Sequence, residues 1–338
     1  MTALPINVSR AEAQKPTMRT ASGADAVRRL TASVVVAMFL CMPIDTIAQS
    51  SMTRAYLDRF EAQKTSVVLP DGQRLAYLEL GTRDAPALVL IHGYTDSARD
   101  WAPLAPLLTP KFRLLIVDLR GHGASDKPDC CYTRFDFAYD IKLLLDALHI
   151  AATDIAGHSL GSIVAQTFAE LWPGSTRHLV LISSTGTSFG TTEPAGSPGS
   201  AKAHAPSWLI DLAQLKDPID ADSAFMRDWW RESMRINPEF FVSRQRRDAA
   251  AIPARVWRAI ADQSLVGVDL RSMLPRVQAP TLLIWGARDT LVGDAGRDAL
   301  RAGLARVEVR TFGSLGHDLF WEDPRAVAGV ISEFLAKK

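Results

Sequence analysis

Several features that mark common protein classes are missing from this sequence of 338 residues. It has no basic run interleaved with aromatic residues, and its formal net charge is only +1, so nothing favours nucleic acid or an acidic partner. It also lacks a phosphate-binding loop of the G-x-x-x-x-G-K type, a C-x-x-C pair and an internal repeat. These absences argue against nucleic-acid binding, a P-loop nucleotide site and a repeat architecture.

Cysteine is scarce, with three residues in the whole chain. Cys41 lies near the N-terminus, and Cys130 and Cys131 are adjacent. Because adjacent cysteines can close only a small, strained ring, we expect two thiols or a labile bond rather than a structural disulfide. No histidine or second cysteine pair lies at ligand spacing, so we expect no metal site.

The remaining composition is that of an ordinary globular protein, with 47% apolar and 22% charged residues. The length suits one large domain, or a core with a smaller inserted domain. Neither value indicates an oligomeric state.

The N-terminal region predicts a secretory signal peptide. Arg28 and Arg29 precede an apolar run over residues 30–42, and small residues near Ala48 follow at the positions that a signal peptidase reads. The run is too short to span a bilayer well, and Pro43 ends it.

We therefore interpret residues 1–48 as a leader and expect a periplasmic or secreted protein. Translation that starts at Met18 would shorten the unusually long stretch before the apolar run. The alternative is a disordered tail with a buried apolar segment, in which case the protein would be cytoplasmic.

From residue 65 onward, strand-like and helix-like stretches alternate. "TSVVLPDG" and "QRLAYLEL" predict a hairpin that turns at Pro70, Asp71 and Gly72. The short apolar runs "ALVLIHG", "RLLIVDLRG" and "APTLLIWG" are typical of strands buried on both faces of a parallel sheet. "FDFAYDIKLLLDALHI" and "SIVAQTFAELWP" have helical periodicity. The alternation predicts an α/β fold with a mostly parallel, doubly wound sheet, built from residues 60–185 and 266–338.

Residues 186–265 interrupt this alternation. A stretch rich in Gly, Ser, Thr and Pro comes first, and several helical patterns follow. We interpret the region as an inserted helical cap that holds four of the eight tryptophans. Each of them could simply fill the core of a small helical layer. Collectively they favour an apolar roof over a pocket, and we expect Trp229 and Trp230 to contact substrate.

The segment "TDIAGHSLGSIVAQ" places Ser159 between two glycines at a strand-to-helix turn. G-x-S-x-G in that setting is a nucleophile elbow, which exposes the serine hydroxyl at the N-terminus of a helix. The free N–H groups there favour the negative charge that develops on an attacked carbonyl. We therefore predict that Ser159 is a catalytic nucleophile.

An acid and a base follow in the order that this fold needs. Asp289 comes just after the apolar run "TLLIWG", and His317 comes after "VEVRTFG". A histidine base with an orienting carboxylate is the chemistry that activates a serine hydroxyl. Asp294 and Asp318 are weaker candidates because neither lies at a strand exit.

Two backbone N–H groups are expected to form the oxyanion hole, those of Leu160 and Tyr94. Leu160 follows the nucleophile, and Tyr94 follows "HG" in the loop after an apolar run. The Tyr94 side chain is also expected to contact substrate. We interpret His92, His122 and His158 as structural.

These motifs resemble the α/β-hydrolase family, in its serine-nucleophile branch of esterases, lactonases and carbon–carbon hydrolases with a helical cap. The matching segments are "DLRGHGASDKP", "GHSLGS", "WGARDTLV" and "GHDLFWEDP", within residues 65–338. The resemblance implies neither a metal nor an organic cofactor. Haloalkane dehalogenases and epoxide hydrolases are similar, but their nucleophile is an aspartate.

We predict a serine hydrolase that cleaves a small, apolar carboxylic ester or lactone, and we expect neither a nucleic-acid partner nor a membrane span. A carbon–carbon bond hydrolase and a peroxide-using or amide-cleaving relative are the enzyme alternatives. A binding protein on an inactive hydrolase scaffold is the alternative from another class.

Overall fold

A computed structural model describes residues 52–189, 207–231 and 237–337. The predicted leader over residues 1–48 lies outside them. Among the described residues, none of the helices combines the length and apolar character that a membrane span requires.

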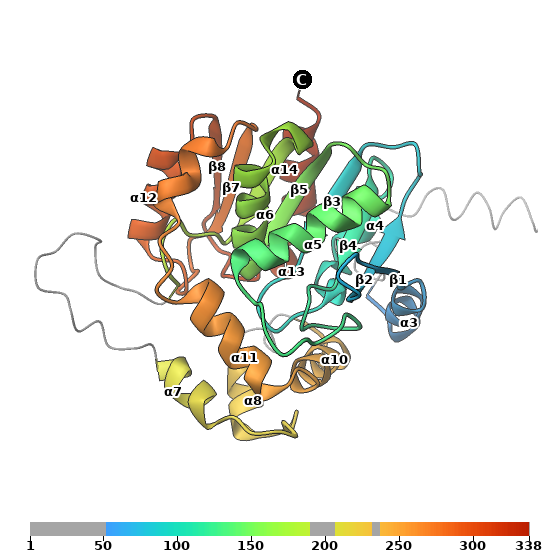
Figure 1. Cartoon of the computed structure of the whole chain (residues 1–338), viewed down its shortest axis with the longest axis vertical. Helices are drawn as coiled ribbons and strands as arrows, with labels where there is room; N and C mark the ends of the chain where they lie inside the picture. Colours follow the sequence, from blue (N-terminus) through green and yellow to red (C-terminus); the bar gives the residue numbers. More distant parts are fainter. Residues whose placement is uncertain (1–51, 190–206, 232–236, 338) are drawn as a thin grey trace, which may run out of the picture. The chain divides into compact units, whose positions relative to one another are not determined.

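One mixed sheet of eight strands runs through the core in the order β1-β2-β4-β3-β5-β6-β7-β8 (Figure 1). The first two strands are joined antiparallel, β2 also pairs antiparallel with β4, and the rest are parallel. The strands are β1 Thr65–Val68, β2 Arg74–Leu80, β3 Ala87–Ile91, β4 Arg113–Val117, β5 Thr153–His158, β6 Thr176–Ile182, β7 Thr281–Gly286 and β8 Val307–Phe312.

The apolar runs became buried strands, as expected of a sheet covered on both faces. Every residue of β3, β5 and β7 is buried. The predicted hairpin is also confirmed: Thr65 lies opposite Tyr77, and the Leu69 N–H donates to the carbonyl of Gln73 across the turn.

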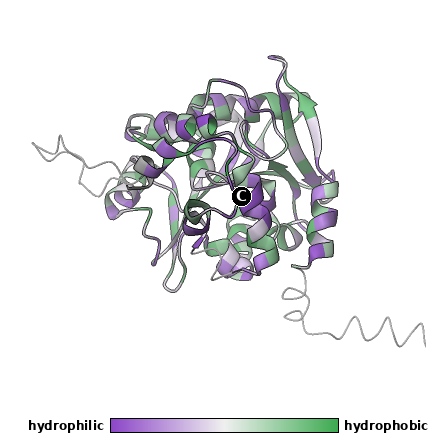
Figure 2. Cartoon of the chain, turned by 90° about the horizontal axis from the view of Figure 1, so that it is seen from below, coloured by the Kyte–Doolittle hydropathy of each residue, from purple (hydrophilic) through white to green (hydrophobic). Residues whose placement is uncertain are grey.

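Helices cover the sheet and flank its ends (Figure 1). Outside the cap they are α3 Arg54–Ala62, α4 Ala105–Leu108, α5 Arg134–Ala147, α6 Leu160–Leu171, α12 Asp294–Gly303, α13 Leu319–Glu322 and α14 Pro324–Leu335. α5 begins at a capping box in which Thr133 and Asp136 each accept the other's backbone N–H. Figure 2 shows hydrophilic and hydrophobic colours alternating along the helices, as expected of helices with one face on a core. All but the last residue of α6 is buried.

Helices inserted between β6 and β7 form the predicted cap. They are α7 Ser207–Gln214, α8 Ala224–Trp229, α10 Glu239–Ala250 and α11 Ala254–Ile260. Trp257 of α11 is fully buried and lies 5.2 Å from Trp229, measured between ring centroids. The α/β fold with an inserted helical cap is therefore confirmed, whereas the domain boundaries at 186 and 265 stay predictions.

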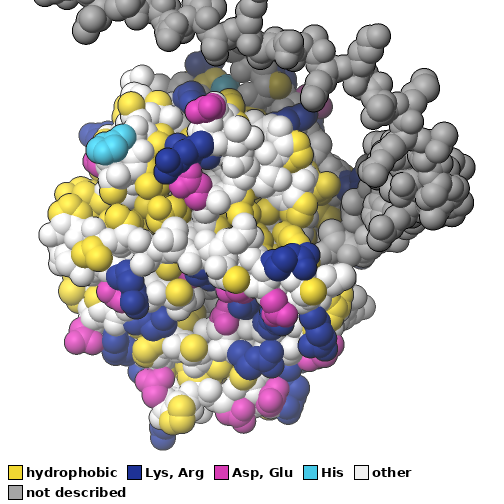
Figure 3. Space-filling model, turned by 90° about the vertical axis from the view of Figure 1, so that its right-hand side faces the viewer, with side chains coloured by type: hydrophobic (Ala, Val, Ile, Leu, Met, Phe, Trp, Pro, Cys, Tyr) yellow, Lys and Arg dark blue, Asp and Glu magenta, His cyan; other side chains and the backbone are white. Residues whose placement is uncertain are grey.

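Cys130 and Cys131 are joined in a disulfide on an exposed loop. We expected either two free thiols or a labile disulfide, and the structure has the disulfide. The lability of this bond stays a prediction. Elsewhere on the surface, basic and acidic side chains lie interspersed (Figure 3), in keeping with the near-zero net charge.

Candidate active site

Ser159 lies in a sharp turn between β5 and α6. Its backbone has φ +51° and ψ −118°, a conformation that a residue with a side chain seldom adopts. Its N–H donates to the carbonyl of Ile182 in β6, at 3.0 Å. The turn places the serine at the N-cap of α6, half-buried, as a nucleophile elbow requires.

The two glycines of the motif allow this turn for a packing reason. A Cβ atom at Gly157 would collide with the backbone of Gly161, and one at Gly161 would collide with the carbonyl oxygen of Ile91. The first turn of α6 therefore lies directly against β5 and β3. Any larger residue at either position would push the helix away from the sheet.

His317 and Asp289 meet at the carboxyl ends of β8 and β7. His317 Nδ1 lies 2.9 Å from Asp289 Oδ2. The other carboxylate oxygen of Asp289 accepts the backbone N–H groups of Leu291 and Val292, at 2.8 and 3.2 Å. Asp289 is thereby fixed, and its bond holds Nδ1 of His317 in the protonated form, which leaves Nε2 free to accept a proton.

The pair is electrostatically coupled. Burial raises the pKa of Asp289, but the His317 ring and the two backbone N–H groups outweigh burial and hold that pKa below its ordinary value. Burial lowers the pKa of His317, but Asp289 raises it more, so the net pKa is above the ordinary histidine value. An imidazolium formed during a reaction would thus be stabilised at this position.

Ser159 and His317 are connected through the neighbouring residue His158. Nε2 of His158 lies 3.1 Å from the carbonyl oxygen of His317, and Ser183 Oγ donates to the same oxygen at 2.6 Å. Among the described residues, no hydrogen bond joins Ser159 Oγ to the His317 ring. Such a bond is often long in an enzyme without substrate and shortens in the complex.

The two predicted oxyanion donors flank the elbow. Leu160 is the first residue of α6, and Tyr94 lies in the loop between β3 and a 3₁₀ turn over Ala98–Trp101. Within the described part of the chain, neither backbone N–H donates a hydrogen bond, so both remain available to an acceptor. Their role as oxyanion donors stays a prediction.

The cap is bonded to this loop. The Tyr94 hydroxyl donates to the carbonyl of Trp257 at 2.6 Å, and Trp229 Nε1 donates to Thr95 Oγ1 at 3.0 Å. The Tyr94 ring packs edge-on against Trp229 and Trp257, with centroids 5.7 and 5.6 Å away. Trp230 is buried and stacks on Trp321 instead. Contact of Tyr94, Trp229 or Trp230 with substrate stays a prediction.

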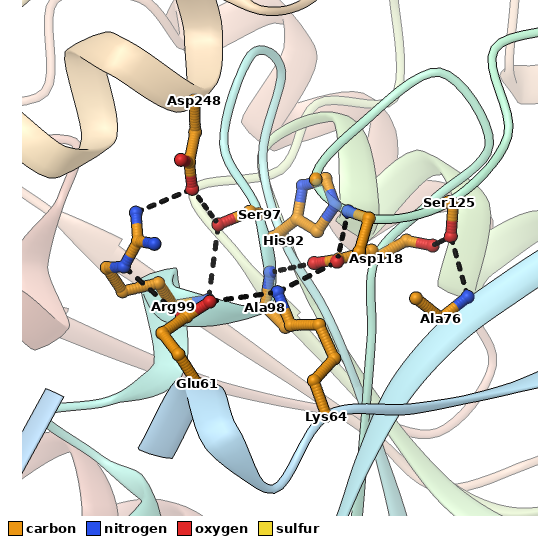
Figure 4. A network of polar contacts seen from close by, with 12 residues as sticks. Glu61, Lys64, Ala76, His92, Ser97, Ala98, Arg99, Asp118, Ser125 and Asp248 are labelled. Atoms are coloured by element: carbon orange, nitrogen blue, oxygen red, sulfur yellow. Dashed lines mark hydrogen bonds and ion pairs between the residues drawn. The ribbon is translucent and has the colours of Figure 1, made fainter. Parts of the chain in front are cut away.

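A polar network holds Ser97, Ala98 and Arg99, which follow Tyr94 in the chain (Figure 4). Asp118 follows β4, is fully buried, and accepts the backbone N–H groups of Ala98 and Ala124 at 2.7 and 2.8 Å. Lys64 lies 2.9 Å from the same carboxylate. His92 donates from Nδ1 to the Gly93 carbonyl and accepts the Leu119 N–H at Nε2, which fits the structural role expected of it.

Burial alone would raise the pKa of Asp118, but Lys64 and the two N–H groups hold that pKa below its ordinary value. A second ion pair, Arg99 with Asp248 of α10, connects the loop to the cap at 2.5 Å. A surface hollow of about 580 Å³ opens beside this network, and none of Ser159, Asp289 and His317 lines it.

The sequence reasoning missed several polar residues around the site. Asp96 and Asp100 are buried in the segment after Tyr94, and Asp118 and Ser183 are buried directly after β4 and β6. For Asp96 and Asp100 the available signal was the density of polar residues in "HGYTDSARDW" just after an apolar run. Loop aspartates are usually exposed, so that signal is weak.

Comparison with known proteins agrees with the fold described above. Residues 86–324 match the family described as alpha/beta hydrolase fold. An uncharacterized protein of Mycobacterium tuberculosis is 26% identical over 272 residues, or 78% of this chain and 79% of that protein. The 2-hydroxymuconate semialdehyde hydrolase of a Pseudomonas species is 29% identical, covering 74% and 87%. A crystallised hydrolase from Pseudomonas aeruginosa has a TM-score of 0.67 and 29% identity, covering 81% and 98%. The chain therefore belongs to the alpha/beta hydrolase fold family.

Proposed function

We propose that this hydrolase cleaves a carboxylic ester or lactone through an acyl-serine intermediate. The observation that carries the proposal is the hydrogen bond between His317 and Asp289. The backbone carbonyl of His317 is in turn bonded to His158, the residue before Ser159. This combination supplies a nucleophile, a base with the correct tautomer and a fixed orienting acid. It does not require a metal or an organic cofactor.

In the proposed reaction, Ser159 Oγ attacks the acyl carbonyl while His317 Nε2 takes the serine proton. The N–H groups of Tyr94 and Leu160 bind the oxyanion. His317 then gives the proton to the leaving oxygen, and later takes a proton from the water that attacks the acyl-enzyme. Asp289 stabilises the imidazolium at both stages.

A carbon–carbon bond hydrolase is the second candidate, because the chain is 29% identical to a 2-hydroxymuconate semialdehyde hydrolase. Against it stands the character of the groups next to the site. The rings packed around Tyr94 and His317 are aromatic and apolar: Trp229, Trp257 and Phe189. Such surroundings suit an apolar acyl or alcohol group better than a substrate that carries a carboxylate.

The test is stopped-flow hydrolysis of p-nitrophenyl acetate, butyrate and octanoate. We expect a burst of p-nitrophenol with an amplitude near one equivalent of enzyme, because acylation of an activated ester outpaces deacylation. The dependence on chain length reports the size of the acyl site. A dienol-ketone substrate of the meta-cleavage type, assayed in parallel, favours the second candidate if it alone is turned over.

Export remains a proposal, supported by the charged, apolar and small-residue order of residues 28–48. We expect the protein expressed with its full N-terminus in a Gram-negative host to be recovered from the periplasm. Intact-protein mass spectrometry should then show cleavage near Ala48. Recovery of uncleaved protein from the cytoplasm would contradict the proposal.

A further inference from the structure

Three buried ionisable side chains converge behind the nucleophile elbow. Asp96, Asp100 and His158 are 6%, 0% and 1% exposed, and one side-chain N or O atom of each lies within 4.8 Å of the others. A methyl group added to Gly93 would lie 2.7 Å from Asp96 Oδ2 and 3.1 Å from His158 Nδ1. The Asp96–Asp100–His158 cluster therefore lies against Gly93, the residue before Tyr94, and its member His158 is the residue before Ser159.

The hydrogen-bond pattern of His158 fixes one of its protons. Nε2 lies 3.1 Å from the carbonyl oxygen of His317, which can only accept, so Nε2 carries a hydrogen. In a neutral imidazole, Nδ1 is then a bare acceptor. Within the part of the chain that the structure describes, Nδ1 has no hydrogen-bond partner, and it lies 3.7 Å from Asp100 Oδ2. A stable arrangement needs a donor for Nδ1 from within the cluster.

The basic side chain beside these carboxylates is the His158 imidazole, which is a cation only when it is protonated. The charged groups that act most strongly on Asp96 are Asp100, Asp318 and Asp248, all acidic. Among the described residues, no lysine or arginine forms an ion pair with Asp96 or Asp100. Burial and then these neighbours raise the pKa of Asp96 well above its ordinary value.

We propose that Asp96 is a neutral carboxylic acid and that it supplies the missing donor to His158. Its O–H serves Nδ1, directly after a small side-chain adjustment or through one bridging water, and Nε2–H holds the carbonyl of His317. Asp96 and His158 are thus positioning residues for the base. The positioning role rests on the proposed function; the protonation state of Asp96 does not.

The first test is the pH dependence of thermal stability in Asp96→Asn. The Asp96 carboxyl ionises near pH 3.9 in the unfolded chain but at higher pH in the fold, so wild-type stability falls as pH rises through this window. An asparagine amide keeps a donor and does not titrate. We expect the Tm of Asp96→Asn to exceed that of wild type by about 3 °C or more at pH 8, with the difference shrinking toward pH 5.

The matched control is Asp154→Asn on β5. Asp154 is also buried beside a histidine, but it accepts from His178 at 2.9 Å and pairs with Arg177 at 3.2 Å. This aspartate is balanced by the Arg177 guanidinium, so its amide variant should lose stability. The two similar substitutions are therefore expected to shift Tm in opposite directions.

The second test addresses positioning. We expect Asp96→Asn to keep kcat within about threefold of wild type, while Asp96→Leu, which has no donor, loses about 10- to 100-fold through misplacement of His317. A lower Tm in Asp96→Asn at pH 8 would overturn the proposal, and so would one equivalent of a divalent metal in the purified protein. If wild type hydrolyses none of the esters, the proposed function fails while the stability test still decides the state of Asp96.

Discussion

Ser159→Ala is expected to lower kcat on p-nitrophenyl butyrate by about 10⁶-fold, because removal of the nucleophile from a triad abolishes the covalent route. The residual rate comes from the binding site and the two oxyanion donors. The burst of p-nitrophenol should be absent in Ser159→Ala, and a fluorophosphonate probe that labels wild type should leave the variant unlabelled. Steady-state and stopped-flow kinetics measure both effects.

The matched control is Ser332→Ala, which removes the hydroxyl of a buried serine in α14 that is not among the proposed site residues. We expect this variant to keep wild-type turnover and labelling. Wild-type turnover in Ser159→Ala would rule out the acyl-serine mechanism. If wild type is labelled by the probe but hydrolyses no ester, the triad is active and the substrate class is wrong.

Asp289→Asn is expected to lower kcat by about 10⁴-fold with little change in the fold. The amide cannot hold Nδ1 of His317 as a donor in the way the carboxylate does, so the wrong tautomer becomes populated. The substitution also removes the main group that raises the pKa of His317. Because the base must be neutral to act, the rise of kcat/KM with pH should move to lower pH in the variant.

The control for this pair is Asp294→Asn, five positions further along the same segment. The Asp294 side chain is 94% exposed and contacts Arg297 only at 3.8 Å. Its loss should leave kcat and the pH profile unchanged. An equal loss in both variants, or an unchanged pH profile in Asp289→Asn, would remove Asp289 from the proposed mechanism.

The elements that could be predicted from sequence are those with a local signal. Buried parallel strands appear as short apolar runs, so β3, β5 and β7 were evident, and the hairpin was marked by its turn at Pro70–Gly72. The nucleophile elbow also has a local signal, because a serine flanked by two glycines between a strand and a helix is typical of this turn. Chain order then limited the acid and the base to Asp289 and His317.

The buried polar groups could not be predicted, because their partners are distant in sequence. Asp118 is balanced by Lys64, 54 positions earlier, and Arg99 meets Asp248 across the cap. Likewise, nothing local places Asp100 beside His158. The cap helices had a clear periodicity. Their position on the Tyr94 loop, however, involves hydrogen bonds from Trp229 and Tyr94 that no sequence pattern encodes.

His317 is restrained from two sides, by Asp289 at its ring and by Ser183 and His158 at its carbonyl oxygen. A side chain held in this way has already given up most of its conformational entropy when the chain folds. If His317 is the base, as proposed, no part of the binding energy of a substrate is needed to order it, and that energy remains available for the transition state. The same restraint ties activity to folding, so variants that loosen β6 or β8 should lose turnover before they lose the fold.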